Sequence, residues 1–151
     1  MILYISVCAA VIILTRFLSD WGINSLKIND IVLIKDVLYF SYVENRGAAF
    51  GILQDSKVFL VIVALALFSG ITYYIARHKD IKMSLLLPLS LIAGGGISNV
   101  LDRLTFGFVV DYIDFRIIHF PVFNLADICV VCGTILLAYY ILFIEGKKNQ
   151  S

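Results

Sequence analysis

Charged residues are scarce in this chain. Asp, Glu, Lys and Arg together make up 15% of its 151 residues, and the mean hydropathy is +0.96. Soluble domains contain roughly 25% charged residues. The formal net charge is only +1 and no basic block is present, so the composition argues against a nucleic-acid partner. A chain with so little charge is expected inside a membrane rather than in water.

Proline and cysteine are rare as well, with two prolines and three cysteines. Cys129 and Cys132 form a Cys-x-x-Cys pair inside an apolar run, without the βαβ context of a thioredoxin-like site. We interpret all three cysteines as buried thiols. Neither His78 nor His119 has a second metal ligand at helical spacing, and no glycine-rich phosphate loop follows a strand. The sequence therefore predicts neither a metal nor a cofactor.

The chain contains four long runs without a charged residue. The middle two runs measure roughly 28 Å at about 1.5 Å per residue, close to the hydrocarbon thickness of about 30 Å. The first run lacks a preceding basic segment and a small-residue cleavage site, so we expect a retained anchor. We predict a mainly α membrane protein, one domain over 1–151, with four transmembrane helices at about 1–18, 57–77, 83–102 and 125–145.

The segments between the spans, about 19–56 and 103–124, hold the remaining mass. Residues 31–34 and 37–43 are rich in β-branched and aromatic side chains and predict short strands, and 105–114 is expected to be partly extended. Because backbone polar groups need partners at a membrane, we expect these strands to form a small extracytoplasmic β-rich platform.

An even number of spans places both chain ends on one side. The short loop at 77–82 and the tail at 146–148 are basic, which predicts that the termini are cytoplasmic. The two segments on the other side hold more Lys and Arg in total, mixed with at least as many acids. We therefore predict that the platform faces outward.

Two carboxylates stand close to predicted span ends in apolar surroundings. Asp111 lies in Gly-Phe-Val-Val-Asp-Tyr (107–112), and Asp127 ends Phe-Asn-Leu-Ala-Asp (123–127). A carboxylate near hydrocarbon is costly and is a candidate functional residue. Asn124 is expected to cap the fourth helix, which places Asp127 where the helix dipole favours the anion. Asp111, under more apolar cover, is expected to favour its neutral form by burial, although in a coupled pair the titration belongs to both carboxyl groups and is not assigned to one of them.

An acid and a base that face one water molecule would provide aspartic-protease chemistry. Spacing alone leaves open a plainer interpretation, in which Asn124 and Asp127 only start a helix and Asp111 is a surface strand residue. Of the other acids, Asp102 is expected in an ion pair at the membrane edge. Asp114 is expected to pair with Arg116 and is not selected as catalytic.

Four motifs occur in order around the predicted spans. They are Asn-Arg-Gly-Ala-Ala-Phe (45–50), Gly-Gly-Ile-Ser-Asn-Val-Leu-Asp-Arg (95–103) and the two aspartate motifs at 107–112 and 123–127. With these motifs the chain resembles the lipoprotein signal peptidase, or signal peptidase II, family. The resemblance implies a membrane aspartic endopeptidase that removes signal peptides from diacylglyceryl-modified prolipoproteins by cleaving before the lipidated cysteine. It also implies the bacterial cytoplasmic membrane, surrounding membrane lipids and an active site toward the outer face.

The resemblance assigns roles residue by residue. It implies that Asp111 and Asp127 are catalytic. It implies substrate-binding or supporting roles for Asn45, Gly47, Asn99, Arg103 and Asn124. The family usually carries Asp-Gln-x-x-Lys near the end of the first helix, whereas positions 15–19 here read Thr-Arg-Phe-Leu-Ser. The glycine that usually precedes the third-helix asparagine is Ser98.

Two alternative functions remain at this stage. A small proton-coupled transporter would use the acids as a proton relay, but these acids fall at span ends rather than near the midplane, where transporter sites usually lie. A non-catalytic, lipid-binding member of the family is the second alternative, and the altered motif at 15–19 motivates it.

Overall fold

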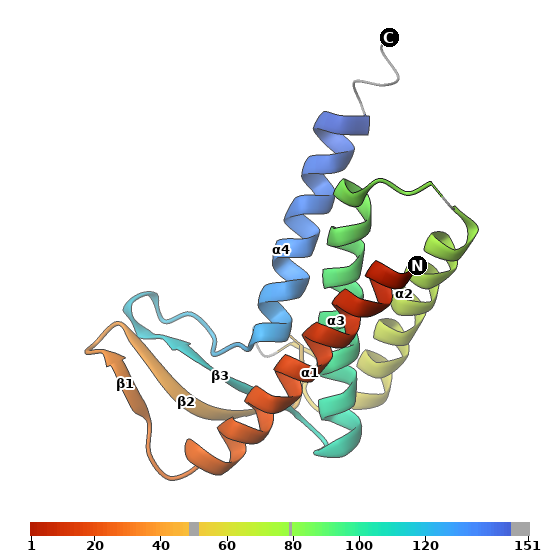
Figure 1. Cartoon of the computed structure of the whole chain (residues 1–151). Helices are drawn as coiled ribbons and strands as arrows, with labels where there is room; N and C mark the ends of the chain where they lie inside the picture. Colours follow the sequence, from red (N-terminus) through yellow and green to blue (C-terminus); the bar gives the residue numbers. More distant parts are fainter. Residues whose placement is uncertain (49–51, 79, 146–151) are drawn as a thin grey trace.

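The computed structural model describes residues 1–48, 52–78 and 80–145. Within these residues, four helices are long and apolar enough to cross a membrane. They are α1 (Ile2–Ser25), α2 (Lys57–Arg77), α3 (Met83–Thr105) and α4 (Leu125–Tyr139), which the π-helical turn η3 (Tyr140–Glu145) continues (Figure 1). A three-stranded antiparallel sheet lies at one end of the bundle, so the predicted mainly helical fold with a small β platform is confirmed.

The sheet has the strand order β1-β2-β3, with β1 at Ile31–Ile34, β2 at Leu38–Asn45 and β3 at Val109–Phe115. Gly107 separates α3 from β3 and has a φ of +92°, a conformation that glycine adopts without steric cost. The register pairs Asn45 at the end of β2 with Val109 at the start of β3. As a result, the last residue of β2 lies close to Asp111.

The first helix is longer than the predicted span, which ended near residue 18. Helix α1 continues to Ser25 because the sheet packs against its last turns. A Cβ on Gly22 would lie 3.3 Å from Val110, and the Trp21 ring meets the rings of Phe40 and Tyr112 edge-on at 5.3 and 6.3 Å. Protein contacts therefore replace lipid along this part of the helix.

Helix α3 is the central element of the bundle. Half of its most apolar window is buried, against 6% for α2 and for α4, and it contacts each of the other three helices. Small residues allow the close approach. Gly94 faces α1, where an added Cβ would lie 3.2 Å from the Cys8 Cα. Gly95 faces α4, where the Cβ would lie 2.5 Å from the Ala126 carbonyl oxygen. This packing brings the polar end of α3 against the start of α4.

We expect Gly95→Ala to lower stability by about 1–3 kcal/mol, because the new methyl group would clash with the backbone of α4. At the neighbouring Gly96, no atom of the described residues lies within 4 Å of the Cβ position apart from its own helix backbone and chain neighbours, so Gly96→Ala is a matched control that should change stability little. Thermal unfolding of the purified variants in the same detergent measures both. Equal melting temperatures for the two variants would show that the α3–α4 contact does not require a glycine.

Candidate active site

Asp111 lies on β3 and is almost completely buried, with 1% of its surface exposed. Each of its carboxylate oxygens accepts a hydrogen bond from an asparagine amide. Asn45 Nδ2 donates to Oδ2 at 2.9 Å, and Asn124 Nδ2 donates to Oδ1 at 2.8 Å. One donor comes from the end of β2 and the other from the residue that precedes α4, so the sheet and the helix together hold this side chain.

Asp127 lies in the first turn of α4 and forms a reciprocal capping arrangement with Asn124. The Asp127 backbone N–H donates to Asn124 Oδ1 at 3.0 Å, and the Asn124 N–H donates to Asp127 Oδ2 at 3.1 Å. This contact confirms the predicted helix cap. The other carboxylate oxygen, Oδ1, accepts a hydrogen bond from Asn99 Nδ2 on α3 at 2.8 Å.

Asn124 therefore contacts both aspartates with a single side chain. Its Nδ2 bonds the Asp111 carboxylate, while its Oδ1 accepts from the Asp127 backbone. It is itself buried, with 3% exposure. An amide has both donors and an acceptor, so it can satisfy a carboxylate and a helix N–H at the same time. Aspartate or leucine at this position could not make both contacts.

The two aspartates line one pocket of about 770 Å³. Asn45, Asn99 and Arg103 also line it. The remaining wall is mostly apolar and includes Val43, Val109, Phe120, Pro121, Val122, Phe123, Ile128, Val130 and Val131. A largely apolar pocket with a few convergent polar groups is typical of a binding site for a ligand with an apolar body.

Arg103 connects this pocket to the segment that follows β2. Its Nη2 donates to the Gly47 carbonyl at 2.7 Å and its Nη1 donates to the Asn99 carbonyl at 3.2 Å, while the Gly47 N–H donates to Asn45 Oδ1 at 3.0 Å. A Cβ on Gly47 would lie 2.7 Å from the Ile52 carbonyl oxygen, so this position has no room for a side chain. The rest of the 45–50 motif, from residue 49, lies outside the described residues.

Burial, together with the negative charge of Asp127, raises the pKa of Asp111 to about 7. The amides of Asn45 and Asn124 and the Arg103 guanidinium act against this rise, because they stabilise the anion. The neutral form that the sequence predicted for Asp111 is thus favoured up to about neutral pH. A carboxyl group in this state can give or take a proton near physiological pH.

The structure brings all seven predicted site residues together around this pocket and the segment beside it. It also shows a residue that sequence reasoning missed. The Tyr112 hydroxyl accepts a hydrogen bond from the Leu125 N–H at 3.1 Å, so β3 also holds the first turn of α4. The sequence feature that could have indicated this contact is the position of Tyr112, which directly follows Asp111 in the 107–112 motif.

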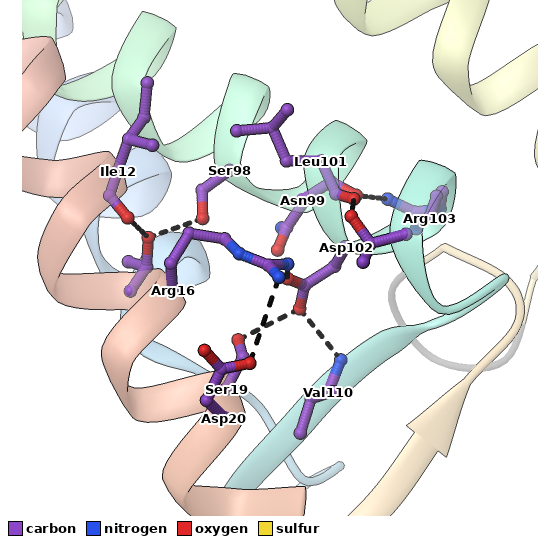
Figure 2. Close-up of polar contacts among 12 residues, drawn as sticks. Ile12, Arg16, Ser19, Asp20, Ser98, Asn99, Leu101, Asp102, Arg103 and Val110 are labelled. Carbon is purple, nitrogen blue, oxygen red and sulfur yellow. Dashed lines mark hydrogen bonds and ion pairs between the residues drawn. The ribbon is translucent and has the colours of Figure 1, made fainter.

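Asp102 and Asp114, the two other acids for which the sequence predicts an ion pair, each form one. Asp114 pairs with Arg116 at 2.6 Å, as predicted, and lies on the sheet away from the pocket lining. Asp102 also takes part in an ion pair, but its partner is Arg16 on α1, at 2.6 Å, rather than its neighbour Arg103 (Figure 2). The first helix thus contributes a charge to α3 that sequence proximity did not indicate.

Comparison with known proteins identifies the family. A family model described as signal peptidase (SPase) II matches residues 7–143. The chain belongs to the signal peptidase II family. Lipoprotein signal peptidases of Clostridium tetani and Clostridioides difficile are each 43% identical to it, over 92% and 97% of this chain and 92% and 99% of theirs.

Two solved structures share the fold of this chain. A bacterial membrane enzyme determined by the in meso method at 2.3 Å resolution superimposes with a TM-score of 0.88 at 27% identity, covering 100% of this chain and 93% of that one. A second, at 1.9 Å, gives a TM-score of 0.84 at 27% identity, with 95% of each chain covered. The chain is therefore a multi-pass bacterial membrane peptidase.

The raised pKa of Asp111 predicts a pH-dependent stability. Between the ordinary carboxyl pKa of 3.8 and about 7, the unfolded chain loses this proton before the folded chain does, so stability falls as pH rises through that window. Asp111→Asn removes the cost, and we expect the variant to be more stable than the wild type at about pH 8, by at most a few kcal/mol.

This advantage should shrink toward about pH 4, where the wild-type carboxyl is protonated in the folded protein. Thermal unfolding in one detergent across this pH range measures it. Asp20→Asn, at an exposed position on α1, controls for the general loss of a carboxylate. An Asp111→Asn effect that does not change with pH would contradict the burial of a neutral acid at this site.

Proposed function

We propose that this peptidase removes signal peptides from prolipoproteins by an aspartic mechanism, with Asp111 and Asp127 as the catalytic pair. One observation carries the proposal. The two carboxylates, on β3 and on the first turn of α4, line the same pocket, and both accept a hydrogen bond from Asn124, Asp111 from its Nδ2 and Asp127 from its backbone N–H. Membership of the signal peptidase II family supports prolipoproteins as the substrates.

The two aspartates would divide the proton transfers between them. Asp111, with its raised pKa, enters the reaction protonated and donates a hydrogen bond to the scissile carbonyl oxygen. Asp127 enters as the anion and takes a proton from the attacking water. After the tetrahedral intermediate forms, the proton that Asp127 took from the water passes to the nitrogen of the leaving amine, the C–N bond breaks and the carboxyl group of the product forms, while Asp111 keeps its own proton. The pair then returns to its starting state with one proton between the two carboxyl groups.

The surrounding polar groups support this division of labour. Asn45 and Asn124 hold the two oxygens of Asp111, and Asn99 holds Asp127. Among the described residues, the buried Nε of Arg103 has no hydrogen-bond partner. A buried donor without a partner is costly, so we assign it to a substrate carbonyl oxygen. Gly47 acts through Arg103, whose guanidinium its carbonyl group holds.

The two alternatives have less support. Family membership favours a peptidase over a proton-coupled transporter. The altered motif at 15–19, which motivated a non-catalytic role, bonds neither Asp111 nor Asp127 among the described contacts. Thr15 bonds Ser98, and Arg16 and Ser19 bond Asp102. The departure from the family pattern thus leaves the contacts of the two aspartates intact.

We further propose that both termini are cytoplasmic and that the pocket opens toward the outer face. The start of α1 and the end of η3 lie away from the sheet, while the start of α4, which carries Asp127, lies beside it (Figure 1). Thiol labelling of Lys35→Cys from outside intact cells, and of Lys82→Cys only after permeabilisation, is the expected pattern in a background whose native cysteines are replaced. The opposite pattern would reverse the orientation.

Replacing either aspartate by its amide should abolish cleavage. Asp111→Asn and Asp127→Asn keep the size of the side chain but cannot exchange the required proton, and we expect losses of at least about 10²–10⁴-fold. Cleavage of one lipidated prolipoprotein by purified protein measures the effect. Asp114→Asn, outside the pocket lining, is the matched control and should retain most activity. Turnover near the wild-type rate by either folded variant would rule out the aspartic mechanism.

The apolar pocket wall and the family relationship also support a lipidated substrate. Burial of each methylene group contributes about 0.8 kcal/mol, so acyl chains in the bilayer would fix the depth of the modified cysteine and orient the scissile bond. We expect an unlipidated precursor to be cleaved far more slowly than its diacylglyceryl form in the same bilayers. The two substrates differ only in the lipid, so the unlipidated precursor is the matched control. Equal rates would show that the lipid does not position the substrate, even with both aspartates essential.

A further inference from the structure

A third carboxylate, outside the pocket, connects three elements of the fold. Asp102 on α3 is 2% exposed. It accepts hydrogen bonds from Arg16 Nη1 at 2.6 Å and Ser19 Oγ at 3.0 Å, both on α1, and from the Val110 N–H on β3 at 3.2 Å (Figure 2). A buried carboxylate is strongly destabilising unless it is paired and hydrogen-bonded. Helix α1, helix α3 and strand β3 therefore meet at this one group.

Arg16 provides the positive charge at this point. Its side chain is 24% exposed, and the guanidinium lies over the Phe106 ring at 4.7 Å and 3.9 Å from the exposed Asp20. Among the residues that the structure describes, it is the cation that forms an ion pair with Asp102. Arg103, which follows Asp102 in the chain, is turned toward the carbonyl groups of Gly47 and Asn99 instead. Arg16 thus neutralises a buried charge that Arg103 does not.

This contact lies one residue from the proposed catalytic group. Asp102 holds the N–H of Val110, the residue before Asp111, and Asn124 Nδ2 approaches the Val110 carbonyl oxygen at 3.4 Å. On α3, Asp102 lies between Asn99 and Arg103, which both line the pocket. Arg16, Ser19 and Asp102 do not line it. Any effect they have on the reaction must therefore pass through the placement of their neighbours.

A second contact holds the same two helices in register one turn away. The hydroxyl groups of Thr15 on α1 and Ser98 on α3 form a hydrogen bond, and these side chains are 3% and 2% exposed. The polar residues at 15, 16 and 19 on α1 therefore all bond to positions 98 or 102 on α3. The contact between α1 and α3 next to the site is therefore polar, and Arg16 contributes its positive charge.

We propose that Arg16 and Asp102 form a positioning pair for the catalytic aspartates, which deepens the function proposed above and rests on it. The Arg16 guanidinium keeps Asp102 ionised and aimed at the Val110 N–H, and this bond sets the position of Asp111 relative to α3. Without Arg16, the buried carboxylate loses its countercharge and the Val110 contact loosens. A displacement of about 1 Å at a reacting group can cost on the order of 10²-fold in rate.

The test compares Arg16→Gln with Arg16→Gln/Ser19→Lys, measuring kcat and KM for one lipidated prolipoprotein. Since Ser19 Oγ lies 3.0 Å from Asp102 Oδ2, a lysine at 19 can return the missing charge to the same carboxylate from the next turn of α1. We expect Arg16→Gln to lose roughly 10- to 100-fold in kcat with KM nearly unchanged, and the added lysine to restore most of it. Asp20→Asn, which removes the other acidic partner of Arg16, is the control and should leave both constants unchanged.

Three results would overturn the positioning role. A well-folded Arg16→Gln protein with wild-type kcat would show that the charge is dispensable. If the single and double variants fold equally well and lose the same factor in kcat, the missing positive charge beside Asp102 is not the cause of the loss. If Arg16→Gln does not fold, the double variant decides: recovery of folding and of wild-type kcat supports the pair, and failure to recover either rejects it.

An independent measurement separates this proposal from the catalytic one. Amide hydrogen exchange of the segment around Val110 should become faster in Arg16→Gln and return toward the wild-type rate in the double variant, whether or not the protein cleaves a given substrate. In the cleavage assay, wild-type turnover that depends on Asp111 and Asp127 establishes the proposed function whatever the Arg16 variants do. Unchanged exchange in Arg16→Gln would count against the positioning pair alone.

Discussion

The need to satisfy carboxylates inside an apolar bundle organises this structure. Asp102 and Asp111 are buried and Asp127 is partly buried, and each takes hydrogen bonds from more than one segment of the chain. Because neither lipid nor hydrocarbon side chains can solvate an anion, these bonds are made within the protein or the group is neutralised. The same bonds hold the sheet against the helices, so the platform and the bundle depend on one set of polar contacts.

Asn124 and helix α3 carry most of this arrangement. Asn124 precedes α4 and bonds both aspartates. Its side chain bonds the Asp111 carboxylate and the Asp127 backbone N–H, and its own backbone N–H bonds the Asp127 carboxylate. Helix α3 brings Asn99, Asp102 and Arg103 to the same place on successive turns. It can lie this close to its neighbours because Gly94 and Gly95 have no side chain. Close packing and polar contact are therefore linked, because the glycines let the helices approach closely enough for the polar side chains to form hydrogen bonds.

Local sequence patterns predicted a large part of the fold. Uncharged runs identified the four helices because a span must match the hydrocarbon thickness, and β-branched runs identified β1 and most of β2. The capping role of Asn124 also followed from local sequence, since a helix cap involves residues three positions apart. The extension of α1 to Ser25 did not, because its last turns are stabilised by strand β3, which lies far away in the chain.

The sequence by itself determined the environment, the number of spans and the two aspartates that we propose as the catalytic pair, because hydropathy, helix capping and the four motifs are local properties of the chain. Only the tertiary structure decided which groups meet. The pairing of Arg16 with Asp102, the bond from the Leu125 N–H to the Tyr112 hydroxyl and the two amides on Asp111 join residues from separate elements. A charge or an amide in the sequence shows that a partner is needed, whereas the partner is chosen by the packing of helices and strands that brings it within about 3 Å.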